Sequence, residues 1–104
     1  MAGRPMRIRA TKTDDHTEVK VLMSHIMETG QRKDSEGKVI PAHFIDLVEA
    51  KWNDKVVLNA QWGPAVSRDP FLSFRFKGGE KGDAVTVSWK DNKGDERSDS
   101  VKIR

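Results

Sequence analysis

Short runs in which apolar and polar residues alternate make up most of this chain. Between the runs stand glycine, proline, asparagine and aspartate, residues whose backbones and side chains suit turns. Alternation with a period of two is typical of β-strands that bury one face, whereas no window of about 11 residues keeps the 3.6-residue period of a helix. The runs that predict strands are residues 6–10, 19–23, 44–52, 56–62, 72–76, 85–89 and 101–103.

Strands with one polar face predict antiparallel sheets that pack as a β-sandwich. Seven strands in about 100 residues is the number typical of an immunoglobulin-like domain. The chain has 104 residues and no cysteine, so aromatic side chains must fill the core in place of an inter-sheet disulfide. We therefore expect one all-β, immunoglobulin-like domain over residues 1–104, with a core that includes Trp52, Trp62, Phe74, Phe76 and Trp89.

The run from Phe44 to Val48 departs from the alternation, because apolar residues fall on both faces of the expected strand. One interpretation is a central strand with a β-bulge, in which an extra residue shifts the side chains that follow. The other is a strand whose outer face is covered by a partner protein.

Composition and charge exclude several classes of function. Charged residues make up 34% of the chain and the net charge is +3, but the two signs are interleaved. Nucleic-acid binding is therefore not expected, because it favours clustered basic residues with stacking aromatics. No apolar run approaches the length of about 18 residues that a membrane span needs. The first ten residues lack the apolar core of a secretory signal.

The pattern Met23-x-His25-x-Met27 is the sharpest chemical signal. If the strand continues that far, the three side chains point the same way, and thioether and imidazole groups suit copper. His16 and His43 could add ligands. The alternative is that Met23 extends the core, His25 lies at the rim and Met27 fills a gap. No cysteine or close histidine pair supports copper, so we predict no metal.

Catalytic motifs are weak. Ser24, His25 and Asp34 could form a triad, but the nucleophile elbow and the oxyanion site that such triads use are missing. The glycine-rich segment 78–82 lacks the strand-to-helix context and the ending of a phosphate-binding loop. We predict no catalytic residue and no cofactor.

A long polar loop, residues 24–41, separates the second and third runs. Gly30, Gly37 and Pro41 mark backbone turns in it, and loops of this length in small domains are usually functional or disordered. Arg32 can form paired hydrogen bonds with a carboxylate, and Asp34 either holds Arg32 or caps the turn that follows. The loop is either a recognition surface or a solvated loop with no partner.

The same loop carries a dense family pattern, at His25, Met27, Glu28, Thr29, Gly30, Arg32, Asp34, Gly37, Lys38, Ile40 and Pro41. A second block matches at Pro64, Ser67, Pro70 and Phe74, with Asp69 where the family more often has asparagine, and a third at Trp89, Asp91 and Gly94. Three blocks in the same order argue against chance. On these residues the chain resembles the SoxZ family, the small subunits of the SoxYZ sulfur-carrier complexes of bacterial thiosulfate oxidation.

The resemblance implies an immunoglobulin-like sandwich that pairs with a SoxY-like subunit. That subunit carries the sulfur substrate covalently on a cysteine in a mobile C-terminal tail, and the SoxZ-like subunit supplies no catalytic residue. Other periplasmic Sox enzymes load, oxidise and hydrolyse the bound sulfur. We therefore expect a non-enzymatic periplasmic protein, exported with a signal-bearing partner, that forms a heterodimer and contacts the other Sox enzymes transiently.

The residues expected to contact the partner lie in the loop and in the strand that follows it: His25, Met27, Arg32, Lys33, Asp34, Lys38, Phe44, Ile45 and Leu47. Two other interpretations stay open at this point. One is a copper-binding periplasmic β-sandwich that uses Met23, His25 and Met27. The other is a generic immunoglobulin-like adhesion or accessory module.

Overall fold

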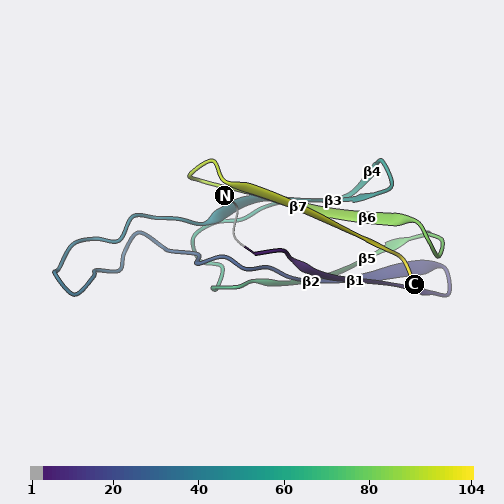
Figure 1. Cartoon of the computed structure of the whole chain (residues 1–104), viewed down its shortest axis with the longest axis horizontal. Coiled ribbons are helices and arrows are strands. Elements are labelled where there is room, and N and C mark those ends of the chain that lie inside the picture. The colour runs from purple at the N-terminus through teal and green to yellow at the C-terminus, as the bar shows by residue number, and fades with distance from the viewer. Residues whose placement is uncertain (1–3) are drawn as a thin grey trace.

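The computed structural model describes residues 4–104, in which seven strands form two antiparallel sheets packed face to face (Figure 1). The predicted all-β sandwich is confirmed, and residues 1–3 of the predicted domain lie outside the described residues. Within residues 4–104 there is no helix long and apolar enough to cross a membrane. The strands are β1 (Arg7–Thr13), β2 (His16–Leu22), β3 (Ile45–Trp52), β4 (Lys55–Gln61), β5 (Phe71–Lys77), β6 (Ala84–Asp91) and β7 (Glu96–Lys102).

One sheet has the order β1-β2-β5 and the other the order β4-β3-β6-β7. In a constant-type immunoglobulin domain the fourth strand joins the first sheet, whereas here β4 stays beside β3. The cause is the tight turn at Asn53 and Asp54, which pairs Trp52 directly with Lys55. Asn53 adopts a φ of 52° there, a left-handed conformation that asparagine tolerates better than most residues.

The core lies between the sheets and is built from the inward rows of the alternating strands. Val19 and Val21 of β2 and Val85 and Val87 of β6 are fully buried, and Trp89 is 2% exposed. Of the aromatic residues predicted to fill the core, Phe76 is also buried. The others, Trp52, Trp62 and Phe74, are half-buried and pack around it.

The run from Phe44 to Val48 begins β3, a central strand. Its pairing with β6 shifts between Ile45 and Leu47, which supports the interpretation of a bulge. The extra residue lets Ile45 and Val48 both face the core, where both are fully buried, while Leu47 is half-buried. A strict period of two would put residues 45 and 48 on opposite faces.

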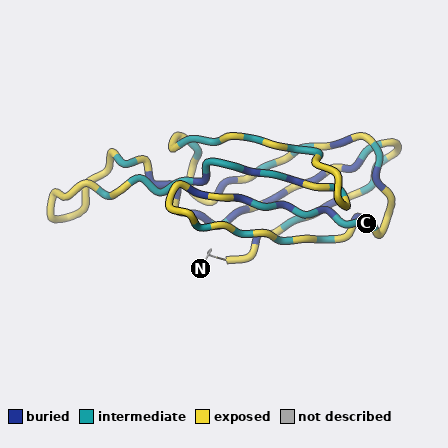
Figure 2. The backbone as a smooth tube through the Cα atoms, turned by 90° about the horizontal axis from the view of Figure 1, so that it is seen from above, coloured by how far each residue is buried: buried dark blue, intermediate teal, exposed yellow. Residues whose placement is uncertain are grey.

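The connection from β2 to β3 projects from one end of the sandwich as a long two-stranded arm (Figures 1 and 2). We call residues 28–43 the hairpin arm. Antiparallel bridges pair Glu28 with His43 at its base and Lys33 with Val39 near its tip. The molecule is 54 Å long and only 22 Å and 19 Å across, because the arm extends its long axis. Most of its residues are exposed, as the yellow tube in Figure 2 shows.

Candidate functional site at the base of the arm

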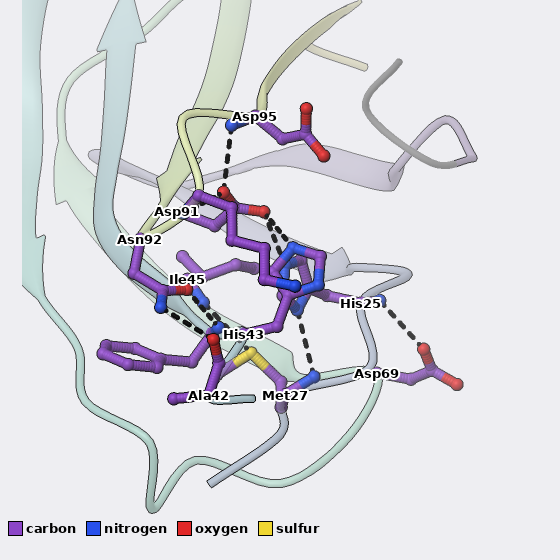
Figure 3. Close-up of polar contacts among 11 residues, drawn as sticks. His25, Met27, Ala42, His43, Ile45, Asp69, Asp91, Asn92 and Asp95 are labelled. Carbon is purple, nitrogen blue, oxygen red and sulfur yellow. Dashed lines mark hydrogen bonds and ion pairs between the residues drawn. The ribbon is translucent and has the colours of Figure 1, made fainter. Parts of the chain in front are cut away.

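A buried carboxylate ties both strands of the hairpin arm to the sandwich (Figure 3). His25 and His43 each donate from Nε2 to Oδ2 of Asp91, over 3.0 Å and 2.7 Å. His25 follows β2, His43 precedes β3, and Asp91 ends β6. The second carboxylate oxygen of Asp91 accepts the backbone N–H groups of Lys93 and Asp95. We call Asp91 with His25 and His43 the anchor, because it joins the arm to β6.

The protonation of His25 follows from its neighbours. The backbone N–H of Met27 donates to Nδ1 of His25 over 3.0 Å, so Nδ1 must present a lone pair. The ring proton therefore sits on Nε2, where it is donated to Asp91. The imidazole of His25 is neutral in this arrangement, and both of its nitrogens are used.

The charge of Asp91 is stabilised inside the protein. Burial disfavours the carboxylate, but the hydrogen bonds from His25 and His43 and from the backbone of Asp95 and Lys93 outweigh it. The pKa of Asp91 is therefore held below its ordinary value of 3.8. The anchor thus contains an ionised acceptor for two imidazole donors.

Met23, His25 and Met27 are all buried, although β2 ends at Leu22 and the expected strand does not continue to them. Met27 takes a φ of 50°, and its sulfur accepts the backbone N–H of Ile45 over 3.3 Å. The candidate ligand atoms of His25 and Met27 are therefore already engaged in bonds within the chain. Such bonds favour an anchoring role over a copper site.

The prediction that the chain has no close histidine pair is wrong. The rings of His25 and His43 lie 4.7 Å apart between centroids, and their ligand atoms and that of Asp91 lie within 4.8 Å of one another. A metal on Nε2 of His25 would force the proton onto Nδ1, against the N–H of Met27. His16 lies at the start of β2, beside Asp15 and Glu18, and takes no part.

Within the arm, Arg32 forms the predicted paired hydrogen bonds, but its acceptor is Glu28 and not Asp34. The two bonds measure 2.6 Å and 3.0 Å. The hydrogen bond from Arg32 lowers the pKa of Glu28 below its usual value. Asp34 instead caps the turn at the tip, where its Oδ1 accepts the backbone N–H groups of Glu36 and Lys38.

The residues predicted to contact a partner divide into three groups. Those in the outer part of the arm are exposed, namely Arg32, Lys33, Asp34 and Lys38. Phe44 and Leu47 are half-buried, whereas His25, Met27 and Ile45 are buried. The side chains of this last group offer no surface to a partner and instead support the arm from inside. The suggested triad does not assemble, because Asp34 lies at the tip of the arm and His25 at its base.

A cavity of about 470 Å³ opens beside the anchor. Its lining combines Arg4 and Arg68 with Asp69, Asp95 and Trp89. The indole N–H of Trp89 has no hydrogen-bond partner among the described residues, and its ring meets that of His25 edge to face, 5.1 Å away. No contact or role was predicted for Asp91 from the sequence. The signal that could have marked it was its place in the third matching block.

Comparison with known proteins adds a family to this geometry. The model of the family described as sulphur oxidation protein SoxZ matches residues 6–102. The matched range contains all seven strands, the hairpin arm and the three residues of the anchor. None of the curated proteins compared with the chain matches it.

Proposed function

This chain belongs to the SoxZ family of sulfur oxidation proteins, and on that premise we propose that it is the partner-binding, non-catalytic subunit of a sulfur-carrier complex. Its partner is a SoxY-like subunit whose C-terminal cysteine carries the covalently bound sulfur. The proposal includes the periplasm as its compartment, reached together with a signal-bearing partner. The observation that carries it is the family match over residues 6–102, which includes the projecting arm.

The hairpin arm supports a binding role because its exposure is otherwise unexplained. An isolated two-stranded hairpin is marginally stable in water, yet this one is fastened at its base by Asp91 and further out by backbone hydrogen bonds from Ile40 to Arg32 and from Asp34 to Lys38. The side chain of Arg32 remains 65% exposed. We propose that Arg32, Lys33, Asp34 and Lys38 contact the partner, together with the exposed parts of Phe44 and Leu47.

The chemistry of the chain fits a subunit that holds a carrier and does not react with its cargo. A sulfur species bound to a cysteine is open to attack by a nearby thiolate, and this chain contains no cysteine. In the anchor, both nitrogens of His25 and both oxygens of Asp91 are engaged in hydrogen bonds. The groups best placed for proton transfer therefore serve structure.

Co-expression with a SoxY-like subunit tests the proposal. A stable interface of this kind buries about 1,200–2,000 Å² in total, so the two chains should elute together in size exclusion at micromolar concentration. Separate elution would contradict it. Copper titration of the purified chain, followed by metal analysis, tests the copper alternative. We expect no stoichiometric copper, and one tightly held ion per chain would favour that alternative.

A further inference from the structure

The outer face of the β1-β2-β5 sheet is a cationic surface with an exposed apolar pair at the end nearest the arm. The pairing of the strands arranges its outward side chains in cross-strand rows. In the row nearest the arm, Leu22 lies between Arg7 and Phe71, and in the next row Lys20 lies between Arg9 and Ser73. Two further rows complete the face, with Thr11, Glu18 and Arg75 in one and Thr13, His16 and Lys77 in the other.

We propose that this face, which we call the cationic face, docks an acidic surface of a second protein that visits the carrier complex. It presents five cations, Arg7, Arg9, Lys20, Arg75 and Lys77, against the single carboxylate of Glu18. That the visitor acts on the carried sulfur rests on the proposed function. The charge and shape of the face do not depend on it.

The cations of this face are arranged for an external partner. Arg9 and Lys20 stand directly opposite each other on neighbouring strands, a like-charge pairing that destabilises a sheet. None of the five cations forms an ion pair with any residue in the range 4–104. An acidic surface placed over them would remove this repulsion.

The outer face of the other sheet shows the opposite arrangement. There Lys51 pairs with Glu49, and Lys90 pairs with Glu96, each over 3.8 Å. Most of the remaining outward residues of β6 and β7 are small and neutral, such as Ser88 and Ser98. Two lysines of this face therefore have acidic partners within the chain, whereas none of the five cations of the cationic face does.

The end of the cationic face nearest the arm is apolar. Leu22 and Phe71 are paired across the strands and are 43% and 63% exposed. They line a shallow groove of about 310 Å³ together with Arg7, Arg9 and Lys20. An exposed apolar pair rimmed by charge is typical of a protein interface, where a large side chain provides the anchor.

The same features favour a protein over the other polyanions. Binding of single-stranded nucleic acid relies on successive aromatic side chains along a basic groove, and this face has one aromatic residue, Phe71. Insertion into an anionic membrane relies on a broad apolar surface, and here only Leu22 and Phe71 are large and exposed. The row of Leu22 lies at the end of the sheet from which the chain enters the arm, because β2 ends at Leu22 and the arm begins at Glu28. A protein bound there would lie next to the proposed carrier subunit.

The test uses the heterodimer with the SoxY-like subunit and the purified enzymes of the thiosulfate-oxidising system. The variant Arg9→Glu with Lys20→Glu reverses the charge of the row next to Leu22 and Phe71. The control, Lys51→Glu with Lys90→Glu, makes the same change of net charge on the opposite face. Because like charges brought together across an interface are costly, we expect the first variant to raise the KM for the carrier complex at least about tenfold. The KM of the control variant should stay within about twofold of the wild-type value, since the substituted face binds no acidic partner.

Two further measurements keep the test independent of folding. Arg9→Gln with Lys20→Gln removes attraction without adding repulsion, and Phe71→Ser removes the apolar anchor. Each should raise the KM while heterodimer formation and the thermal unfolding midpoint stay at the wild-type values. The KM of the wild type should rise steeply with ionic strength, and that of the charge-reversed variant should rise much less.

Three outcomes would overturn the inference. The first is equal KM values for the charge-reversed variant and its control. The second is binding of the wild-type heterodimer to phosphatidylglycerol vesicles, and the third is its binding to DNA. Either would count if reversing the charges of Arg9 and Lys20 abolishes the binding and the control variant retains it. Failure of the wild-type heterodimer to form would instead contradict the proposed function. The two failures are therefore distinguishable.

Discussion

The sandwich and the hairpin arm of this protein are held together by different forces. The sandwich buries rows of apolar side chains from both sheets, among them Val19, Val87 and Trp89. The arm contributes few buried side chains and depends on polar contacts at Asp91, Glu28 and Asp34. Hydrophobic burial grows with area and tolerates local change, whereas each polar contact in the arm is specific. Substitutions should therefore separate stability from recognition.

Removal of the largest core side chain should have the largest effect, and it should act on the sandwich. Trp89→Ala should lower the free energy of unfolding by roughly 3–5 kcal/mol, as truncation of large aromatic core residues does. Chemical denaturation measures this change, and Phe71→Ala, at an exposed aromatic position, is the control. A midpoint of Trp89→Ala equal to that of the wild type would contradict the role of Trp89 in the core.

Loss of the anchor should loosen the arm more than the sandwich. Asp91→Ala leaves the imidazole donors of His25 and His43 without their acceptor, and unsatisfied buried groups destabilise by about 1–3 kcal/mol each. We expect a loss of about 2–3 kcal/mol in all, because water can reach the opened cavity.

Native-state hydrogen exchange shows where that loss falls. The backbone amides of Glu28 and His43 bond across the base of the arm and should exchange much faster in Asp91→Ala, while the amides of β6 keep their order of protection. Asp91→Asn, which retains one acceptor oxygen, should give an intermediate result. Unchanged exchange at the arm would contradict the anchoring role.

A backbone change at the end of the sandwich far from the arm should affect the sandwich alone. Gly79 has a φ of 90°, and an added Cβ would overlap the hydroxyl oxygen of Thr17, which is fully buried. Gly79→Ala should therefore destabilise by about 1–3 kcal/mol. Gly82→Ala is the control, because Gly82 also has a positive φ but has open space around it. It should lower the free energy of unfolding by less than Gly79→Ala does. Binding of the partner at saturating concentration should be unchanged in both.

Acid should weaken the anchor through Asp91. Its pKa in the folded protein lies below the ordinary value of 3.8, so its stabilising effect is fully present above about pH 4 and is lost as the pH falls through the folded-state pKa. The difference in unfolding free energy between wild type and Asp91→Asn should therefore shrink as the pH falls below 3.8. A difference that is constant over this range would show that Asp91 does not titrate as the anchor requires.

A change in the outer arm should affect recognition and leave stability nearly intact. Arg32→Ala should shift the free energy of unfolding by no more than about 0.5 kcal/mol, as exposed positions usually do. It should still weaken partner binding, because arginine is enriched among binding hot spots. Lys81→Ala removes the same charge from an exposed turn between β5 and β6, away from the arm, and is the matched control. Partner affinity and sulfur-dependent turnover are the measurements.

The results for Arg32→Ala can contradict the proposal in two ways. Unchanged affinity and turnover would leave the arm without a function in binding. Reduced turnover with every binding step intact would mean that this subunit takes part in the chemistry.

The sequence by itself determined the strands and much of the core. Alternation with a period of two depends only on neighbouring residues, so the seven strands and the inward position of Trp89 follow from the order of residues alone. The pattern from His25 to Pro41 also indicated the family that the comparison then found. These features could be predicted because turn residues and side-chain alternation act within a few positions of the chain.

Only the tertiary structure decided which sheet β4 joins and what the buried polar groups contact. Asp91 meets His43 across 48 positions and His25 across 66 positions of the chain, and that meeting depends on the pairing of β3 with β6. The acceptor of Arg32 is Glu28 rather than Asp34 because the arm turns at Asp34 and uses that carboxylate for its own backbone. The cationic face likewise arises from the register of three strands, which places residues distant in the sequence side by side.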